Sequence, residues 1–116
     1  MLHHIVLMKF KPGVRDEDVQ RLEEMLDALP EKVIEIQTYE FGRDTARSER
    51  SYDFALVSGF ANLEALGRYQ THPDHQKVVA HIREICDDIR AVDFSSKYAP
   101  PEKLAEPDPF DGFKMP

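Results

Sequence analysis

The pattern of apolar residues changes its period several times along the chain. Residues 3–11 (HHIVLMKFK) are apolar at nearly every position and meet no turn signal before Pro12-Gly13. Because both alternating sets are apolar, this segment predicts a strand that is covered on both faces. From Asp16, a good N-cap, the spacing becomes helical, and Pro30 is expected to end the helix. The apolar stripe of this helix consists of Val19, Leu22, Met25, Leu26 and Leu29.

Two more strands and an exposed loop are expected in the middle of the chain. Residues 32–42 and 52–60 are rich in β-formers, and Gly42 marks the end of the first segment. Residues 43–51 between them are charged or small and contain no apolar anchor, which indicates an exposed loop. The second segment places on one face the side chains of Tyr52, Phe54, Leu56 and Phe60.

The second half contains two helical segments separated by a break at His72-Pro73. Proline suits a first helical position, and its ring disfavours the helical region for the residue before it. Asn62 can cap the first segment, in which Leu63 and Leu66 are expected to face inward, with Tyr69 as a further candidate. The second segment has an apolar face made of Val78, Val79, Ile82, Ile85 and Cys86. Residues 89–98 then predict a last strand, with Val92, Phe94 and Tyr98 on one face.

This element order is β-α-β-β-α-β, which predicts a ferredoxin-like α+β fold. Its four-stranded antiparallel sheet should carry the helices on one face only. Residues 1–98 form this domain. Residues 99–116 are a tail rich in proline and acid, too poor in apolar residues to fold alone. The tail is expected either to be disordered or to lie on a neighbouring molecule through Phe110 and Phe113.

The strands are apolar on both faces, although the helices can cover only one. A bare apolar sheet face is too large a patch for a soluble monomer. A second copy of the chain, packed sheet to sheet across a twofold axis, is the simplest cover. We therefore expect a homodimer.

Composition narrows the function classes. The 116 residues are 41% hydrophobic and 32% charged, as is ordinary for one globular domain. The formal net charge of −7 argues against a nucleic-acid partner. No apolar run suits a membrane helix and residues 2–10 do not make a signal peptide, so a cytoplasmic location is expected. The single Cys86 excludes an intramolecular disulfide and is expected to be buried.

The segment Tyr69-Gln-Thr-His72-Pro73-Asp-His75 concentrates the candidate chemistry. Its phenol and two imidazoles can meet at one point and handle protons, but an ordinary helix start capped by His72 fits equally. His4 lies among apolar strand residues, either as a hydrogen-bonded core histidine or as the wall of a pocket. A metal site of His4, His72 and His75 lacks H-x-x-x-H spacing and an evident carboxylate, so no metal is expected.

Asp53 and Asp93 lie within strands that are otherwise apolar. An unpaired buried carboxylate is costly. Each is therefore expected to pair with Arg90, with a histidine or with a backbone N–H.

Several short motifs, taken in their order along the chain, resemble those of the stress-responsive A/B barrel (Dabb) family. No single motif is specific, whereas the ordered set is, and it covers about residues 2–98. The resemblance implies a dimeric α+β barrel with a cavity between the sheet and the helices of each subunit. The matching motifs are His4-Ile-Val-Leu-Met-Lys-Phe, Gly42, Tyr52-Asp53-Phe-Ala-Leu, Phe60, the segment from Tyr69 to His75, and Val92-Asp93-Phe94.

The resemblance also implies candidate roles. One family member, olivetolic acid cyclase, closes a polyketide with a tyrosine and a histidine of a Y-x-x-H-P-x-H motif. These positions are Tyr69 and His75 here, the candidate catalytic pair, with His4 and His72 as candidate ligand-binding residues. The expected function is binding, or cyclase- or lyase-like acid–base chemistry, on a small hydrophobic carbonyl compound without a cofactor. A non-catalytic stress or interaction protein is the alternative, and a heme- or oxygen-handling monooxygenase is the third candidate.

Overall fold

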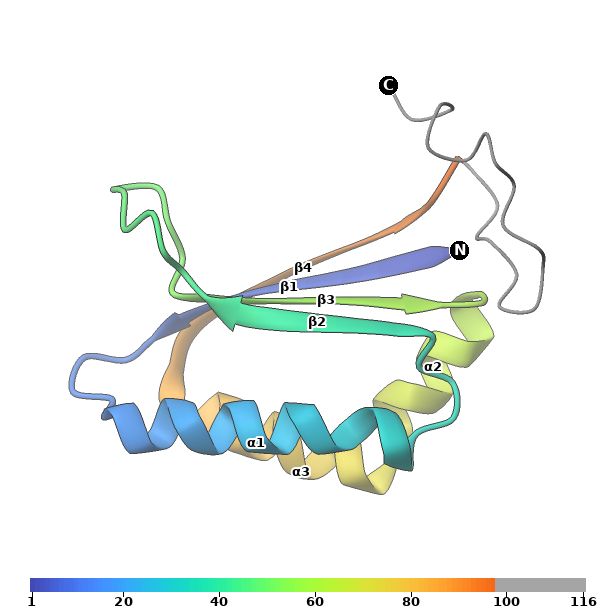
Figure 1. The fold of residues 1–116 in the computed structure, drawn as a ribbon, viewed down its shortest axis with the longest axis horizontal. Coiled ribbons are helices and arrows are strands. Elements are labelled where there is room, and N and C mark those ends of the chain that lie inside the picture. Colours follow the sequence, from blue (N-terminus) through green and yellow to red (C-terminus); the bar gives the residue numbers. More distant parts are fainter. Residues whose placement is uncertain (98–116) are drawn as a thin grey trace, which may run out of the picture.

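The computed structural model describes residues 1–97, which form a four-stranded sheet with three helices on one face (Figure 1). The strand order is β2-β3-β1-β4, and each neighbouring pair is antiparallel. This confirms the ferredoxin-like fold, whose second helix is divided at His72-Pro73. Tyr98 and the expected tail lie outside the described residues. The elements are β1 (Leu2–Phe10), α1 (Asp16–Lys32), β2 (Thr38–Arg43), β3 (Phe54–Phe60), α2 (Leu63–Thr71), α3 (Pro73–Ile85) and β4 (Cys86–Ser95).

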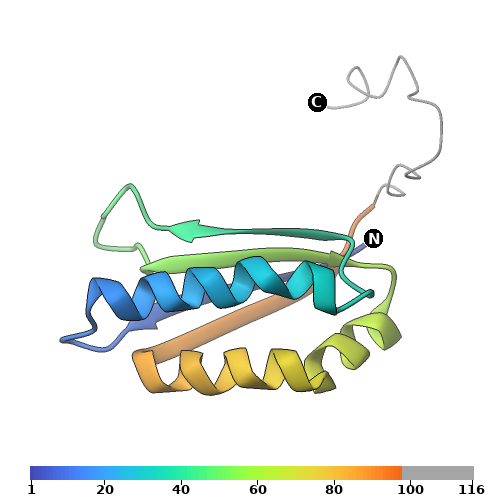
Figure 2. The ribbon, with the colours of Figure 1, turned by 60° about the horizontal axis from the view of Figure 1, so that its bottom comes forward.

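The hydrophobic core lies between the helices and the inner face of the sheet. Figure 2 shows α1 and α3 running side by side beneath the strands. In an antiparallel pair, directly opposite residues share a face, so the register of β1 with β3 gathers alternate residues of both strands on the inner face. The expected stripe of α1 is confirmed: Val19, Leu22, Leu26 and Leu29 are buried, and Met25 is partly buried against the core. The strands contribute Leu2, Met8, Phe54, Leu56 and Phe60.

The ends of α1 differ from the prediction. The helix begins at Asp16, so Arg15 takes the N-cap position, and the Asp18 carboxylate accepts the Arg15 backbone N–H at 3.1 Å. Pro30 does not end the helix, which continues to Lys32. A proline removes its own N–H from the helical ladder, and its ring crowds the carbonyl four residues earlier. The last turn still closes here, because the Val33 N–H donates to the Leu29 carbonyl at 2.9 Å.

β2 and β4 begin several residues from the predicted positions, and β3 begins at Phe54, so Tyr52 is not part of the strand as predicted. Residues 33–37 form the turn after α1, in which the Ile36 N–H donates to the Val33 carbonyl, so β2 starts only at Thr38. The chain leaves α3 at Ile85, and Cys86 is the first residue of β4 rather than part of a helical face. Cys86 is buried, as expected.

One expected core residue is exposed. Leu63 is 66% exposed, because the buried side of α2 passes through Ala65, Leu66 and Tyr69. At about 100° per residue, Leu63 lies roughly 110° around the helix from the middle of that side. The prediction that Leu63 faces inward was wrong.

The outer face of the sheet carries apolar side chains that no helix covers. The large apolar side chains of this face lie on β1, β3 and β4, and Val92 and Phe94 are 54% and 48% exposed. They are Ile5, Leu7, Val57, Val92 and Phe94.

None of the helices within residues 1–97 is long and apolar enough to span a membrane.

Candidate functional site

Tyr69 occupies the centre of an aromatic cluster on the inner face of the sheet. α2 directs its side chain toward the core, where it is 0% exposed. The centroid of its ring lies 4.1 Å from that of His75 and 4.9 Å from that of Phe60. The ring of His4, on β1, lies 6.3 Å away in an edge-on orientation. Tyr69, His75 and His4, which are three of the four candidate site residues, therefore meet in one cluster.

Tyr39 of β2 also belongs to this cluster. Its hydroxyl and that of Tyr69 form a hydrogen bond of 2.8 Å. Tyr39 was not among the residues predicted from the sequence, although the sequence carries one signal for it. Tyr39, Phe41 and Arg43 alternate along β2 on the face that points toward the helices, and a tyrosine in such a set buries a hydroxyl that needs a partner.

The surroundings of His75 determine which ring nitrogen carries the hydrogen and whether the ring is charged. The Gln70 carbonyl lies 3.2 Å from His75 Nδ1, and a carbonyl can only accept, so Nδ1 carries the hydrogen. In the neutral ring, Nε2 is therefore the basic nitrogen. Burial lowers the pKa of His75 below its ordinary value, and this effect exceeds the opposing effect of the Gln70 carbonyl. The ring is therefore neutral at neutral pH.

Both phenols of the cluster are neutral at the same pH. Burial raises the pKa of Tyr69 to about 12, with an opposing contribution from the hydrogen bond to Tyr39. Burial also raises the pKa of Tyr39, and its proximity to Tyr69 raises it further. The cluster thus places a neutral phenol beside a neutral imidazole, a combination that can serve as hydrogen-bond donor and general base.

His4 and the two aspartates have defined partners. His4 is buried, and its Nδ1 hydrogen-bonds to the Asp93 carboxylate of β4, directly across the strand pair. The Asp53 carboxylate accepts the Phe10 backbone N–H at 2.8 Å. The expected pairing of Asp53 and Asp93 is confirmed. The Asp93 carboxylate also anchors the His4 ring beside Tyr69.

His72 caps α3. Its backbone is extended (φ −63°, ψ 134°), as a residue before proline should be, and its Nδ1 accepts the Asp74 backbone N–H at 3.1 Å. This was one of the two interpretations that the sequence left open. The cap occupies the Nδ1 lone pair, so only Nε2 of His72 is available for another role.

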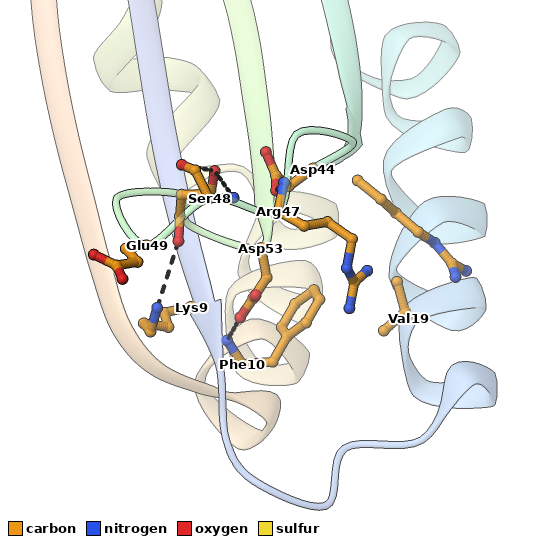
Figure 3. A pocket seen from close by; sticks show the side chains of 10 residues that line it. Lys9, Phe10, Val19, Asp44, Arg47, Ser48, Glu49 and Asp53 are labelled. Carbon is orange, nitrogen blue, oxygen red and sulfur yellow. Dashed lines mark hydrogen bonds between the residues drawn. The ribbon is translucent and has the colours of Figure 1, made fainter.

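Two pockets within residues 1–97 lie away from the cluster. One pocket, of about 420 Å³, lies at the end of the sheet near Phe10 and the β2–β3 loop (Figure 3). The other, of about 260 Å³, lies between α1 and α3 over Met25, Leu29 and Val78. Among residues 1–97, no three His, Cys, Asp or Glu side chains are grouped so that they could hold a metal ion.

The fold and the inner-face cluster define a ferredoxin-like α+β domain with a tyrosine–histidine centre between the sheet and the helix pair. The chain belongs to the stress responsive A/B barrel domain family, whose sequence model matches residues 2–96. The family suggested by the sequence motifs is therefore confirmed.

Two relatives from Arabidopsis thaliana support this membership, and both are described as stress-response A/B barrel domain-containing proteins. The chain is 33% identical to one of them over 103 residues and 30% identical to the other over 112 residues. The matches cover 86% and 92% of this chain but 38% and 52% of those proteins. The chain thus spans about half or less of the length of these curated relatives.

Solved structures share the fold. A Thermobifida fusca protein, described as dimeric, ferredoxin-like and of unknown function, has a TM-score of 0.76 at 32% identity, over 82% of this chain and 90% of that one. Two more distant structures show the fold alone. They are a hydroxynitrile lyase from Passiflora edulis (14% identity, TM-score 0.74, 85% and 96% covered) and an antibiotic biosynthesis monooxygenase (16%, 0.68, 83% and 98%).

Proposed function

We propose that this chain forms a cytoplasmic homodimer that binds and transforms a small hydrophobic carbonyl compound beside Tyr69 and His75. The observation that carries the proposal is the 4.1 Å contact between these two rings, both of which burial keeps neutral. In the proposed step, His75 Nε2 takes a proton from the carbon next to the carbonyl. The Tyr69 hydroxyl donates to the carbonyl oxygen and stabilises the negative charge that develops there.

The packing around Tyr69 defines which groups a bound ligand would contact and from which side it would enter. The Tyr69 hydroxyl is hydrogen-bonded to Tyr39. A hydroxyl can accept one hydrogen bond while it donates another, so Tyr69 can donate to a substrate carbonyl while Tyr39 donates to it. His75 is only partly buried and gives the approach from solvent. His4, held by Asp93, forms the wall on the sheet side, and His72 borders the approach at the α2–α3 break.

One resemblance supports this chemistry. Tyr69 and His75 match the positions of the catalytic pair in the Y-x-x-H-P-x-H motif of olivetolic acid cyclase. That reaction is an aldol condensation, which agrees with a donor and a base placed side by side.

The test is deuterium exchange at carbons next to the carbonyl in a panel of alkyl methyl ketones, followed by NMR in D₂O. Exchange above the buffer background should fall roughly 100-fold or more in His75→Ala, the range of one general base. Tyr69→Phe should also reduce it. His81→Ala is the matched control, because His81 is a partly buried histidine of α3 that bonds to the Asp18 carbonyl at 3.0 Å, away from the cluster. Equal exchange in the wild type and in His75→Ala contradicts the proposal.

One observation favours a second candidate, a non-catalytic interaction protein. Tyr69 is fully enclosed, and its hydroxyl already has a protein partner, as is typical of a structural tyrosine. In that case the outer sheet face is the functional surface. This candidate predicts no catalysed exchange with any ketone, and equal losses of stability in Tyr69→Phe and Tyr39→Phe.

A further inference from the structure

A second candidate site lies at the end of the sheet, apart from the tyrosine–histidine cluster. It is the 420 Å³ pocket between the end of β1, the start of α1 and the β2–β3 loop (Figure 3). This volume lies within the range of small-molecule pockets. Phe10 and Val19 supply its apolar floor, and charged side chains surround it.

The backbone of the β2–β3 loop is strained where the loop covers this pocket. Arg47 has φ 53° and is the only non-glycine with positive φ among residues 1–97. Such a conformation is unfavourable for most side chains and persists where the surroundings impose it. The Asp44 carboxylate accepts the Arg47 N–H at 2.6 Å, and the Ser48 and Ser51 hydroxyls bond to each other at 2.8 Å. These bonds hold Arg47 in place.

Arg47 differs from the other arginine of the pocket. Arg43 is saturated, because its guanidinium contacts Asp16 at 2.6 Å and Glu23 at 2.9 Å. Within residues 1–97, the hydrogen bonds and ion pairs include none to the Arg47 guanidinium. Figure 3 shows this side chain extending from the loop toward Phe10 and Val19. A strained loop therefore presents an uncommitted guanidinium above an apolar floor.

We propose that this pocket binds a small organic monocarboxylate, with its apolar body on Phe10 and Val19 and its carboxylate on Arg47. The planar guanidinium matches a carboxylate with two parallel hydrogen bonds. The lining favours a ligand with a single negative charge over a dianion. Arg43 is already paired with Asp16 and Glu23, and the Asp44, Glu49 and Asp53 carboxylates oppose the second charge of a dianion such as phosphate.

This site does not depend on the function proposed above. Neither Tyr69 nor His75 lines the pocket, and none of the pocket residues belongs to the tyrosine–histidine cluster. Ligand binding here should therefore be the same in His75→Ala as in the wild type.

The experiment is a titration of the full chain with phenylacetate, followed by backbone amide shifts in ¹⁵N NMR. Saturable shifts are expected at Phe10 and in the β2–β3 loop. Arg47→Gln should weaken binding roughly tenfold, the effect of losing one charge-assisted contact. Arg50→Gln is the matched control, since Arg50 lies in the same loop and carries the same charge but does not line the pocket. Arg50→Gln should bind as the wild type does.

Two further probes identify what the site recognises. 2-Phenylethanol has a similar apolar body without the charge, and inorganic phosphate is an anion of higher charge without the apolar body. Both should bind more weakly than phenylacetate. The proposal is overturned if phenylacetate gives no saturable shift at millimolar concentration, if Arg47→Gln and Arg50→Gln have the same effect, or if either comparison probe binds as tightly.

Discussion

At the scale of single residues, the chemistry of the cluster depends on burial rather than on charge. Among the residues that the structure describes, His4 is the only member of the cluster with an acidic partner, Asp93. Burial shifts the pKa of Tyr69 upward and that of His75 downward, and both shifts favour the neutral form. Because the donor and the base are both neutral, neither carries a buried charge before a substrate binds. The pKa of His75 is therefore the quantity to measure.

The stability of the protein should fall in acid because of His75. Its folded pKa lies below its ordinary value of 6.5, so below that pH the unfolded chain binds a proton that the folded chain does not. The free energy of unfolding should therefore decrease as the pH falls below 6.5 and be insensitive to His75 above it. Urea denaturation of the wild type and His75→Gln, between about pH 5 and pH 8, isolates this contribution as the difference between the two curves.

The difference between the two curves removes the contributions that are common to both proteins. The proximity of His4 and of His72 lowers the pKa of His75 in the same direction as burial does. Two parallel curves, with the same slope in His75→Gln and in the wild type, would show that His75 titrates as it does in the unfolded chain.

At the scale of elements, the break between α2 and α3 sets the geometry of the site. α2 ends at Thr71 and α3 begins at Pro73, with His72 extended between them. This change of direction brings His75, on the first turn of α3, against Tyr69 near the end of α2. In a continuous helix, residues six apart lie on different faces, so the two rings could not meet in this way.

The cap at His72 should contribute measurably to stability. His72→Ala leaves the Asp74 N–H without its side-chain acceptor and should lower the free energy of unfolding by about 1 kcal/mol. His72→Asn is the matched variant, because asparagine is among the best caps and should restore most of the loss. Thermal or urea denaturation measures both. If alanine and asparagine are equally destabilising, the imidazole acts through contacts other than the cap.

Much of this architecture can be predicted from the sequence, and the failures have identifiable physical causes. The strand–helix order and the His72-Pro73 break follow from local periodicity and from proline geometry. The boundaries near Pro30 and at Cys86 do not, because hydrogen bonds and strand pairing formed in the folded chain decide them.

The candidate site is likewise predictable from the sequence only where it depends on residues close together in the chain. Proximity in sequence indicates that Tyr69 and His75 can meet. The hydroxyl pair of Tyr39 and Tyr69 links residues 30 positions apart and depends on how β2 packs over α2. The register of the sheet places Asp93 opposite His4 in the same way. Periodicity assigns each side chain to a face, but it does not specify its partner.

At the scale of the whole molecule, the sheet has two faces with different roles. The helices cover the inner face, and the outer face presents Ile5, Leu7, Val57, Val92 and Phe94 to solvent in the single chain. A solved structural relative at 32% identity is described as dimeric. A continuous apolar patch on a sheet whose other face is already covered is typical of a contact between copies.

A charge placed on the outer face should therefore separate the dimer. Val92→Glu puts a carboxylate in the middle of β4, opposite Ile5, and desolvating it between two sheets should weaken association at least tenfold. Ile34→Glu is the matched control, because Ile34 is 91% exposed and lies in the turn after α1 rather than on the sheet. Sedimentation equilibrium gives the mass of each variant. We expect a dimer for the wild type and Ile34→Glu, and a shift toward monomer for Val92→Glu with unchanged far-UV circular dichroism. A wild type that sediments as a monomer at micromolar concentration would mean that something other than a second copy covers this face.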